Sequence, residues 1–427
     1  MNEIIVNPPR EKWRQLIQRP QFNTVELDAS VSEIIESVKQ KGDEALKKYA
    51  LQFDGFAPEN LLVSPDEILA AGISIGKGLK KAIRTAKKNI EKFHQGQKED
   101  VKEIETMPGV VCWQKSIPVE NVGLYIPGGT APLFSTLLML AIPAQIAGCD
   151  NIVVCTPANA NGTINVVILF VAQLLGIKKI YKLGGAQAIA AMAYGTQSVE
   201  KVDKIFGPGN QFVTSAKKLV NLAGVAIDML AGPSELAVYA DETCIPGFVA
   251  ADLLSQAEHG TDSQVVLVAN KQQIITAVIE EVNNQIHLLP RKDIIEKSLS
   301  NSRFVVIGDI EEAFDFLNTY APEHLIIASK NARKIAKYVK NAGSVFIGNY
   351  SPESAGDYAS GTNHSLPTNG LAKTQGGVSI SSFMKKVTFQ EISKKGIRNI
   401  GATVEKMAAA EGLDAHKNAA SIRLKKK

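Results

Sequence analysis

The chain has 427 residues, of which 45% are hydrophobic and 21% are charged, and its formal net charge is +4. This length is too great for a single hydrophobic core, so we expect two or more domains. The composition is that of a soluble globular protein. Basic residues form a run only at residues 423–427, where no aromatic side chain interleaves with them, so no nucleic-acid partner is expected.

The cysteines and the apolar segments indicate in which cellular compartment the protein is expected. None of the four cysteines belongs to a CxxC pair, and nothing suggests a disulfide framework. The N-terminus lacks a basic start followed by a long apolar run, so no signal peptide is expected. The most apolar segments, residues 133–147 and 164–177, are shorter than the roughly 20 residues that a membrane-spanning helix needs. We therefore expect a cytoplasmic protein that makes no membrane contact.

The first hundred residues predict helices. Apolar residues recur at helical spacing through Val31, Ile34 and Val38. A further helix is expected to begin at Ser64, because Pro65 suits its first position and Glu67 completes a capping box. Residues 1–25 are expected to form a small helical extension at the N-terminus.

From about residue 108, short strands alternate with helices. Strands are predicted at residues 122–126, 151–155 and 179–183, and a similar alternation follows residue 235. This order predicts an α/β fold with parallel sheets. Glycine-rich turns follow strands at residues 127–129, 184–187 and 207–210, where such sheets bind ligands. None is a GxGxxG fingerprint, since Phe212 stands in place of the third glycine, so the turns indicate only a phosphate or a nucleotide.

Residues 246–256 predict a helix that ends near Gly260. Gln256 and His259 are three residues apart, so they share one face of its last turn. That turn carries the negative end of the helix dipole. An amide oxygen beside an imidazole nitrogen there would suit a cation. The alternative is a polar helix end with a solvated histidine.

Four of the six histidines lie in polar segments, whereas His94 and His287 fall on surface-like helices and are set aside. The four are His259, His324, His364 and His416. Zinc accepts imidazole nitrogen and carboxylate or amide oxygen. A cysteine-free ligand set is therefore chemically sound, formed by Gln256, His259, Asp357 and His416. Because the spacing is dispersed, a structural role remains the alternative for each histidine taken singly.

Glu323 and His324 are the best acid–base candidates. Neighbouring side chains diverge by about 100° on a helix, so the two could reach different parts of one ligand. Histidine can take and return a proton near neutral pH, and a glutamate beside it could activate water. The alternative is a structural helix N-terminus with Pro322 at its first position.

The last segment, residues 381–427, is expected to be a polar helical tail. Thr388 and Glu391 fit a capping box. The tail is too small for a core of its own and is expected to pack on another surface.

Taken together, these segments resemble the histidinol dehydrogenase family. The resemblance runs from about residue 20 to 420. It is carried by residues 123–129, 205–210, 227–228, 231–235, 254–260, 322–325, 357–364 and 415–418. Long segments in the family's order are far more specific than any single motif, and no functional position departs from the pattern.

The resemblance implies two Rossmann-like domains in an aldehyde dehydrogenase-like architecture, one inserted in the other. Residues 26–107 and 236–380 would form one domain, which carries the metal and catalytic residues. Residues 108–235 would form the NAD side, and residues 381–427 would be a tail exchanged between two subunits.

The resemblance also implies an activity, the last step of histidine biosynthesis. This is an NAD-dependent, four-electron oxidation of L-histidinol to L-histidine through a bound aldehyde. One Zn²⁺ per subunit would be held by Gln256, His259, Asp357 and His416 and would orient the substrate. His324 would remove the hydroxyl proton, and Glu323 would activate the water that adds to the aldehyde.

Further residues take roles by the same resemblance. Ser234, His364 and Glu411 would line the substrate site together with the metal ligands and His324. Tyr125, Gln187 and Asn210 would contact NAD. The family is a homodimer, so His416 would complete the site of the partner, and a monomer should bind zinc poorly.

Two other function classes remain open from the residues alone. One is a zinc-dependent hydrolase with Glu323 as general base, which needs no NAD. The other is a nonenzymatic metal- or nucleotide-binding protein of the same fold. Unlike aldehyde dehydrogenases, the chain has no cysteine beside a base or an oxyanion motif, so no cysteine nucleophile is expected.

Overall fold

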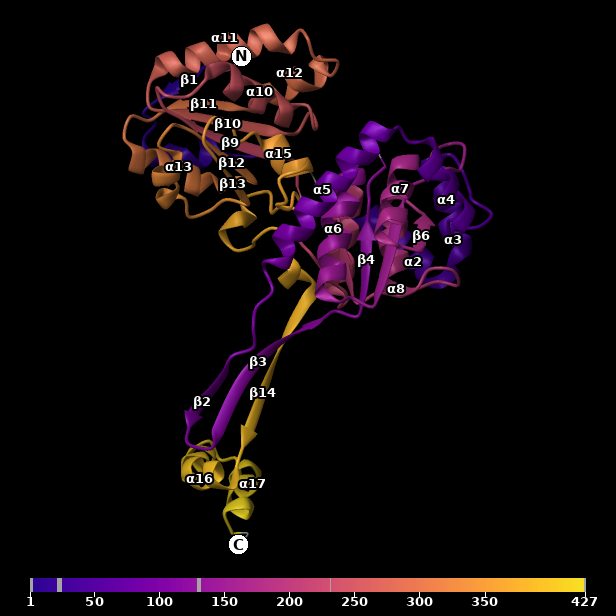
Figure 1. Cartoon of the computed structure of the whole chain (residues 1–427), viewed down its shortest axis with the longest axis vertical. Coiled ribbons are helices and arrows are strands. Elements are labelled where there is room, and N and C mark those ends of the chain that lie inside the picture. Colours follow the sequence, from indigo (N-terminus) through magenta and orange to yellow (C-terminus); the bar gives the residue numbers. More distant parts are fainter. Residues whose placement is uncertain (1–2, 21–24, 129–131, 231, 426–427) are drawn as a thin grey trace.

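The computed structural model describes residues 3–20, 25–128, 132–230 and 232–425. Two lobes lie side by side, and a long arm extends away from them (Figure 1). Each lobe is built on a parallel sheet, which confirms the expected α/β class with two parallel-sheet domains. Within the described ranges, no helix combines the length and the hydrophobicity that crossing a membrane would require.

The first lobe contains a six-stranded parallel sheet. Its strands lie in the order β1 (Ile4–Val6), β11 (Arg303–Val306), β10 (Gln264–Ala269), β9 (Glu235–Ala240), β12 (His324–Ala328) and β13 (Ser344–Ile347). One face is covered by α10 (Pro246–Ala257), α11 (Gln272–Ile286) and α12 (Lys292–Ser300). The other is covered by α1 (Trp13–Leu16), α13 (Ile310–Tyr320) and α14 (Ala332–Ile335). Every residue of β9 and β10 is buried, as expected for a parallel strand with helices on both sides.

The second lobe contains a five-stranded parallel sheet. Its strands lie in the order β6 (Lys179–Lys182), β5 (Asn151–Thr156), β4 (Asn121–Tyr125), β7 (Lys204–Phe206) and β8 (Ala226–Ile227). One face packs against α4 (Pro65–Ser74), α5 (Lys77–Gln95), α6 (Phe134–Ala147) and α7 (Val166–Leu175). The other packs against α2 (Val25–Lys41), α3 (Asp43–Asp54), α8 (Gly185–Tyr194) and α9 (Gln211–Leu222). The capping box expected at Ser64 is present, with both of its hydrogen bonds.

The helices of residues 25–95 pack on the second lobe, whereas the sequence had suggested grouping residues 26–107 with 236–380. Val31 and Leu46 share a core with Ile189, and Ile83 shares one with Leu137. The physical reason is that these helices complete the cover over both faces of the five-stranded sheet. We therefore propose that the second lobe comprises residues 25–100 and 119–230 and is inserted between β1 and β9 of the first.

The N-terminal segment also differs from the expected helical extension. Residues 4–6 form the edge strand β1, which pairs with β11, and only then do short helices follow. The remaining short helices are α15 (Glu353–Tyr358) and the 3₁₀ turns at Arg10–Lys12, Ala336–Tyr338, Leu371–Lys373 and Ile380–Phe383.

The arm is an antiparallel sheet that carries two helices at its tip (Figure 1). Its strands lie in the order β14 (Met384–Ile392), β3 (Val110–Pro118) and β2 (Glu103–Met107), and its helices are α16 (Lys394–Ala410) and α17 (Asp414–Lys425). The capping box predicted at Thr388 and Glu391 is wrong, because both residues lie within β14. Phe389 stacks on Trp113 of β3 at 5.4 Å between ring centroids, and this cross-strand pair stabilises a strand there. Ser393 caps α16 instead.

His94, set aside as a surface residue, is completely buried near the end of α5. Its Nδ1 lies 2.9 Å from the Ile90 carbonyl oxygen, and its Nε2 lies 3.5 Å from the Asn363 amide nitrogen. Asn363 also donates to the Met139 carbonyl at 2.6 Å. His94 therefore joins α5 to the loop that precedes His364.

We predict that His94 makes stability depend on pH. Burial lowers the pKa of His94 in the folded chain. Protons therefore bind preferentially to the unfolded chain, and stability is lost as pH falls through about 6.5, the ordinary pKa of histidine. The midpoint of urea unfolding should fall less between pH 7.5 and 5.5 in His94→Gln than in the parent protein. His287→Gln, at an exposed site, is the control; equal slopes in all three proteins would contradict the prediction.

Candidate functional site

The charged residues gather where the two lobes face each other. Glu323 and His324 lie at the amino end of β12, and Ser234 immediately precedes β9. The helical setting considered for Glu323 and His324 is therefore wrong, because His324 begins a strand. Helix α10 runs back from the far end of β9, so its last turn brings Gln256 to the same edge.

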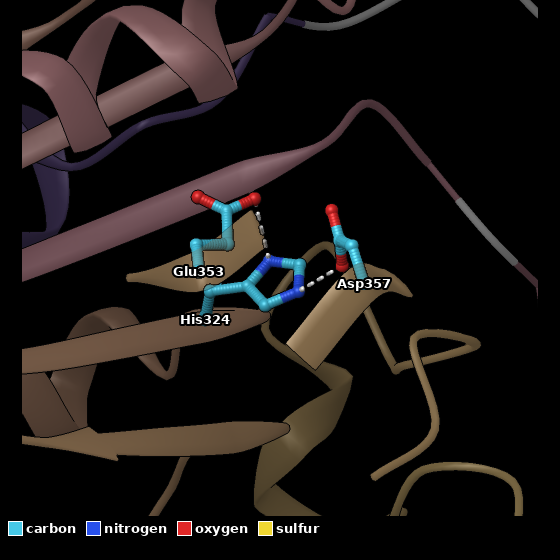
Figure 2. Close-up of side chains that lie close together, drawn as sticks. All are labelled: His324, Glu353 and Asp357. Carbon is cyan, nitrogen blue, oxygen red and sulfur yellow. Dashed lines mark ion pairs between the residues drawn. The ribbon is translucent and has the colours of Figure 1, made fainter. Parts of the chain in front are cut away.

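The imidazole of His324 lies between the carboxylates of Glu353 and Asp357 (Figure 2). Nδ1 of His324 is 3.7 Å from Glu353 Oε1, and Nε2 is 3.6 Å from Asp357 Oδ1. A third carboxylate, that of Glu323, comes within 3.7 Å of Nδ1. His324 is only 3% exposed and Glu353 only 1%. These charges are withdrawn from water, so they interact strongly.

The acids and the imidazole alter one another's protonation. Burial lowers the pKa of His324, but the charges of Glu323, Glu353 and Asp357 outweigh it and raise the pKa to about 10. Burial raises the pKa of Glu323 to about 7 and that of Glu353 to about 8. Near neutral pH the protonated imidazole therefore faces an ionised Asp357, whose pKa His324 lowers despite burial, and two glutamates that are only partly ionised. Among the described residues, His324, Glu353 and Asp357 also place ligand atoms within 4.8 Å of one another, as a metal ion would require.

Gln256 is completely buried next to this cluster. In the amide orientation that satisfies its neighbours, its nitrogen donates to Glu353 Oε1 at 2.6 Å. Its oxygen then occupies the position 3.5 Å from His259 Nδ1, which is itself 3.4 Å from Ser234 Oγ. An amide oxygen and an imidazole nitrogen thus converge, and both are ligands that zinc accepts. His259 is also close enough to Asp357 for their charges to interact.

His364 connects the cluster to the second lobe. Its Nδ1 lies 2.9 Å from the Asp357 carbonyl oxygen, and its Nε2 lies 3.2 Å from Thr136 Oγ1 on α6. The structure therefore brings His364 next to the cluster through the backbone of Asp357.

Glu411 and His416 do not lie near this cluster. Glu411 caps the end of α16, His416 lies on α17, and both are exposed at the tip of the arm. Figure 1 shows these helices far from both lobes. Within one chain, the ligand set expected from the sequence therefore lacks its fourth member.

The three residues expected to contact NAD line one cavity of about 450 Å³, at the carboxyl edge of the five-stranded sheet. Tyr125 ends β4, Gln187 lies in the first turn of α8, and Asn210 caps α9. Gln187 is completely buried, and within the described ranges neither atom of its amide has a hydrogen-bond partner. An unsatisfied buried amide is costly, so this one fits a polar ligand in the cavity.

The turn before Asn210 requires glycine at position 207 because of its backbone conformation and its close packing. Gly207 has φ +128°, and a Cβ atom there would lie 2.1 Å from the Tyr125 carbonyl oxygen, so only glycine fits. The buried ion pair of Lys217 and Asp228 holds the turn, since Lys217 donates to the Gly207 carbonyl at 2.8 Å. Of the three glycine-rich turns, the one at residues 127–129 lies partly outside the described residues, because Gly129 is not among them.

A second cavity, of about 460 Å³, adjoins the first. Asn210 lines both, and the second is also lined by Ser234 and His259. The two cavities together therefore extend from Tyr125 and Gln187 to Ser234 and His259, which lie beside the charged cluster.

The sequence did not point to two supporting residues, Glu353 and Arg19. Glu353, which orients Gln256 and faces His324, precedes Asp357 by four residues on one helix face, and this spacing was an available signal. Arg19 makes a bidentate pair with Glu235 at 2.5 and 2.7 Å, and the Glu235 N–H donates to Glu323 Oε2 at 3.0 Å. No local pattern connects residue 19 with residue 235.

A two-lobed α/β fold with a buried histidine near a nucleotide-sized cavity fits an oxidoreductase, and the sequence comparisons assign the chain to that class. The sequence matches the family described as histidinol dehydrogenase over residues 17–424. The chain belongs to the histidinol dehydrogenase family.

Individual relatives agree over nearly the whole chain. The histidinol dehydrogenase of Bacteroides thetaiotaomicron is 56% identical over 424 residues, which is 99% of each chain. That of Campylobacter jejuni is 52% identical over 98% of this chain and 97% of its own. The crystal structure of histidinol dehydrogenase from Elizabethkingia anophelis superimposes with a TM-score of 0.97 at 55% identity, covering 99% of this chain and 98% of that one.

We predict that no thiol takes part in the reaction. The four cysteines are Cys112, Cys149, Cys155 and Cys244, and all are unpaired. None of them lines either cavity described above, and burial raises the pKa of Cys149 and Cys244 to about 11. A variant with all four replaced by alanine should keep at least roughly half of its turnover. Complete loss in a variant that circular dichroism shows to be folded would mean that a thiol is required.

Proposed function

We propose that this chain oxidises L-histidinol to L-histidine in two NAD-dependent steps, with a zinc ion held by Gln256, His259, Asp357 and His416 of the partner subunit. The observation that carries the proposal is the orientation of the Gln256 amide. Its nitrogen is engaged by Glu353, so its oxygen is directed to the side of His259. Residues that fix the orientation of a metal ligand in this way typically strengthen metal binding.

Zinc, when bound, would orient the substrate by its imidazole and amino nitrogens. The geometry of the cluster supports a cation there, because His324, Glu353 and Asp357 place ligand atoms within 4.8 Å of one another. Ser234 and His364 lie beside the cluster and would line the substrate site, and Glu411 would join them from the partner subunit. The unpaired cysteines support the expected cytoplasmic location.

NAD, when bound along the two cavities, would accept a hydride in each oxidation. The buried and unsatisfied amide of Gln187 supports this placement. The hydroxyl oxygen of Tyr125 accepts a hydrogen bond from the Gly185 N–H at 3.0 Å. The O–H of Tyr125 therefore remains available to donate a hydrogen bond to a ligand. Asn210 uses its amide oxygen to cap α9, which leaves its amide nitrogen for the nucleotide.

His324 is proposed as the base of the first oxidation. Its Nδ1 faces the Glu235 carbonyl and the carboxylates of Glu323 and Glu353. Its Nε2 has no hydrogen-bond partner among the described residues. A histidine whose Nδ1 is held in this way presents Nε2 to the substrate. Because the neighbouring acids raise the pKa of His324, it would take the hydroxyl proton only once a cation bound at Asp357 offsets their charge and lowers that pKa.

Glu323 is proposed to take a proton from the water that adds to the aldehyde. Its Oε2 is held by the Glu235 N–H at 3.0 Å, and the side chain lies beside His324. The resulting hydrate loses a second hydride and becomes the carboxylate. The sum is one alcohol, one water and two NAD⁺ converted to one carboxylate, two NADH and three protons.

The metal requirement tests the proposal directly. Dialysis against a chelator should abolish NADH formation from histidinol, measured at 340 nm, and added Zn²⁺ should restore it. Zinc content measured by mass spectrometry should fall with Gln256→Ala, which reports binding apart from turnover. Full activity after chelation, or NAD-independent hydrolysis by the holoenzyme, would refute the assignment.

Substitutions at the acid–base pair should separate the two oxidations. His324→Gln should lower histidinol oxidation by roughly 10²–10⁴-fold, the usual contribution of a general base. Glu323→Gln should mainly slow oxidation of supplied histidinaldehyde, because hydration of the aldehyde needs a proton acceptor. His287→Gln and Glu242→Gln, at exposed sites, are matched controls and should be unaffected. Equal effects of both test variants on both oxidations would contradict the division of roles.

A homodimer with shared sites predicts complementation. His259→Ala and His416→Ala should each be nearly inactive, yet a mixture refolded together should recover about one quarter of the parent activity. Half of the dimers would then be mixed, and each mixed dimer would hold one intact site. His259→Ala mixed with the double variant should recover nothing. Activity of His416→Ala alone, or no recovery from the first mixture, would show that subunits do not share the site.

A further inference from the structure

The carboxylate of Asp54 has no hydrogen-bond or ion-pair partner among the described residues, and it lies at a helix C-terminus, which disfavours negative charge. Asp54 is the last residue of α3, where the helix dipole is negative. Burial alone raises its pKa to about 6. A desolvated, unpaired carboxylate at a helix C-terminus is costly, which is usual for a group that is satisfied by a ligand.

Asp54 lines the cavity that also contains Tyr125 and Gln187. A Cβ atom on Gly184 would lie 3.3 Å from Asp54 Oδ1, so the carboxylate lies directly over the turn that begins α8. The charge of Asp54 acts on the buried Tyr125 hydroxyl as well. Three polar side chains from three elements therefore share the cavity, and the completely buried amide of Gln187 is also unsatisfied.

Apolar side chains give the same cavity a surface for a flat ring. Phe53 and Phe212 line it while remaining 53% and 41% exposed, and Pro127 and Pro157 line it too. Aromatic side chains left open beside a polar group suit a nucleobase that stacks while its sugar is hydrogen-bonded.

The order of the cavities identifies which end of a dinucleotide would lie here. The adjoining cavity reaches Ser234 and His259 beside the charged cluster, and the two cavities have Asn210 in common. The nicotinamide end has to lie near the reacting carbon, so the adenosine end falls in the cavity of Asp54.

We propose that Asp54 accepts hydrogen bonds from the 2′- and 3′-hydroxyls of the adenosine ribose and thereby selects NAD over NADP. This inference rests on the proposed function, because it assumes that the dinucleotide occupies the two cavities. A carboxylate can accept from two neighbouring hydroxyls at once, as in other dinucleotide sites. The same carboxylate repels a 2′-phosphate, which is how a charge excludes the wrong ligand.

The test compares Asp54→Asn and Asp54→Ala with Glu59→Gln. Glu59 carries the same charge five residues further on, but it is exposed and does not line the cavity. Each Asp54 variant should raise the KM for NAD about tenfold with little change in kcat, since a charge-assisted hydrogen bond is lost from binding. The preference for NAD over NADP in kcat/KM should fall at least about tenfold. Glu59→Gln should change neither.

Direct binding gives a second readout. Calorimetry with ADP-ribose and its 2′-phosphorylated form should show that the Asp54 variants lose affinity for the first and gain relative affinity for the second. The melting temperature of Asp54→Asn should not fall, because the carboxylate makes no bond in the free protein.

The variant Gln187→Ala distinguishes failure of the inference about Asp54 from failure of the proposed NAD site. If it raises the KM for NAD while both Asp54 variants leave KM and cofactor preference unchanged, the inference about Asp54 is wrong and the cavity remains the NAD site. If Gln187→Ala also leaves the KM for NAD unchanged, the cavity is not the NAD site. In that case both this inference and the NAD part of the proposed function fail.

Discussion

The buried imidazole of His324, surrounded by three carboxylates, is the constraint on which the rest of the site depends. Burying a carboxylate is costly unless hydrogen bonds or opposite charges replace the lost water. The Glu235 N–H supports Glu323, and the Gln256 amide supports Glu353. These supports come from β9 and α10, whereas the acids come from the start of β12 and from α15. The buried cluster is therefore stable only when β9, α10, β12 and α15 are all in place.

The position of the cluster follows from the direction of the chain. Strands β9 and β12 are parallel, and α10 runs back against β9, so Gln256 and His324 meet at the amino edge of the six-stranded sheet. The cavity of Tyr125 and Gln187 lies at the carboxyl edge of the other sheet, where parallel sheets usually bind ligands. The two edges face each other across the lobes, which suits a reaction between a nucleotide and a small polar substrate.

Local patterns predicted the elements well where no distant contact competes with them. The capping box at Ser64 and the helix that ends near Gln256 depend on neighbours a few residues away. The similar pattern at Thr388 failed because pairing with β3, including the stack of Phe389 on Trp113, stabilises a strand instead. His94 was misjudged for a related reason. Its lysine-rich flanks are exposed, but the ring itself faces the loop of Asn363.

The sequence by itself determined the α/β class, the family, and the residue types able to bind a metal or move a proton, because these depend on the order of side chains along the chain. It did not reveal that Glu353 holds the Gln256 amide, that Arg19 reaches Glu235, or that helices of residues 25–95 belong to the second lobe. It also did not indicate how far α17, with His416, lies from the lobes of its own chain (Figure 1). Only the tertiary structure decided these matters, because each depends on a contact or distance between segments that no local periodicity connects.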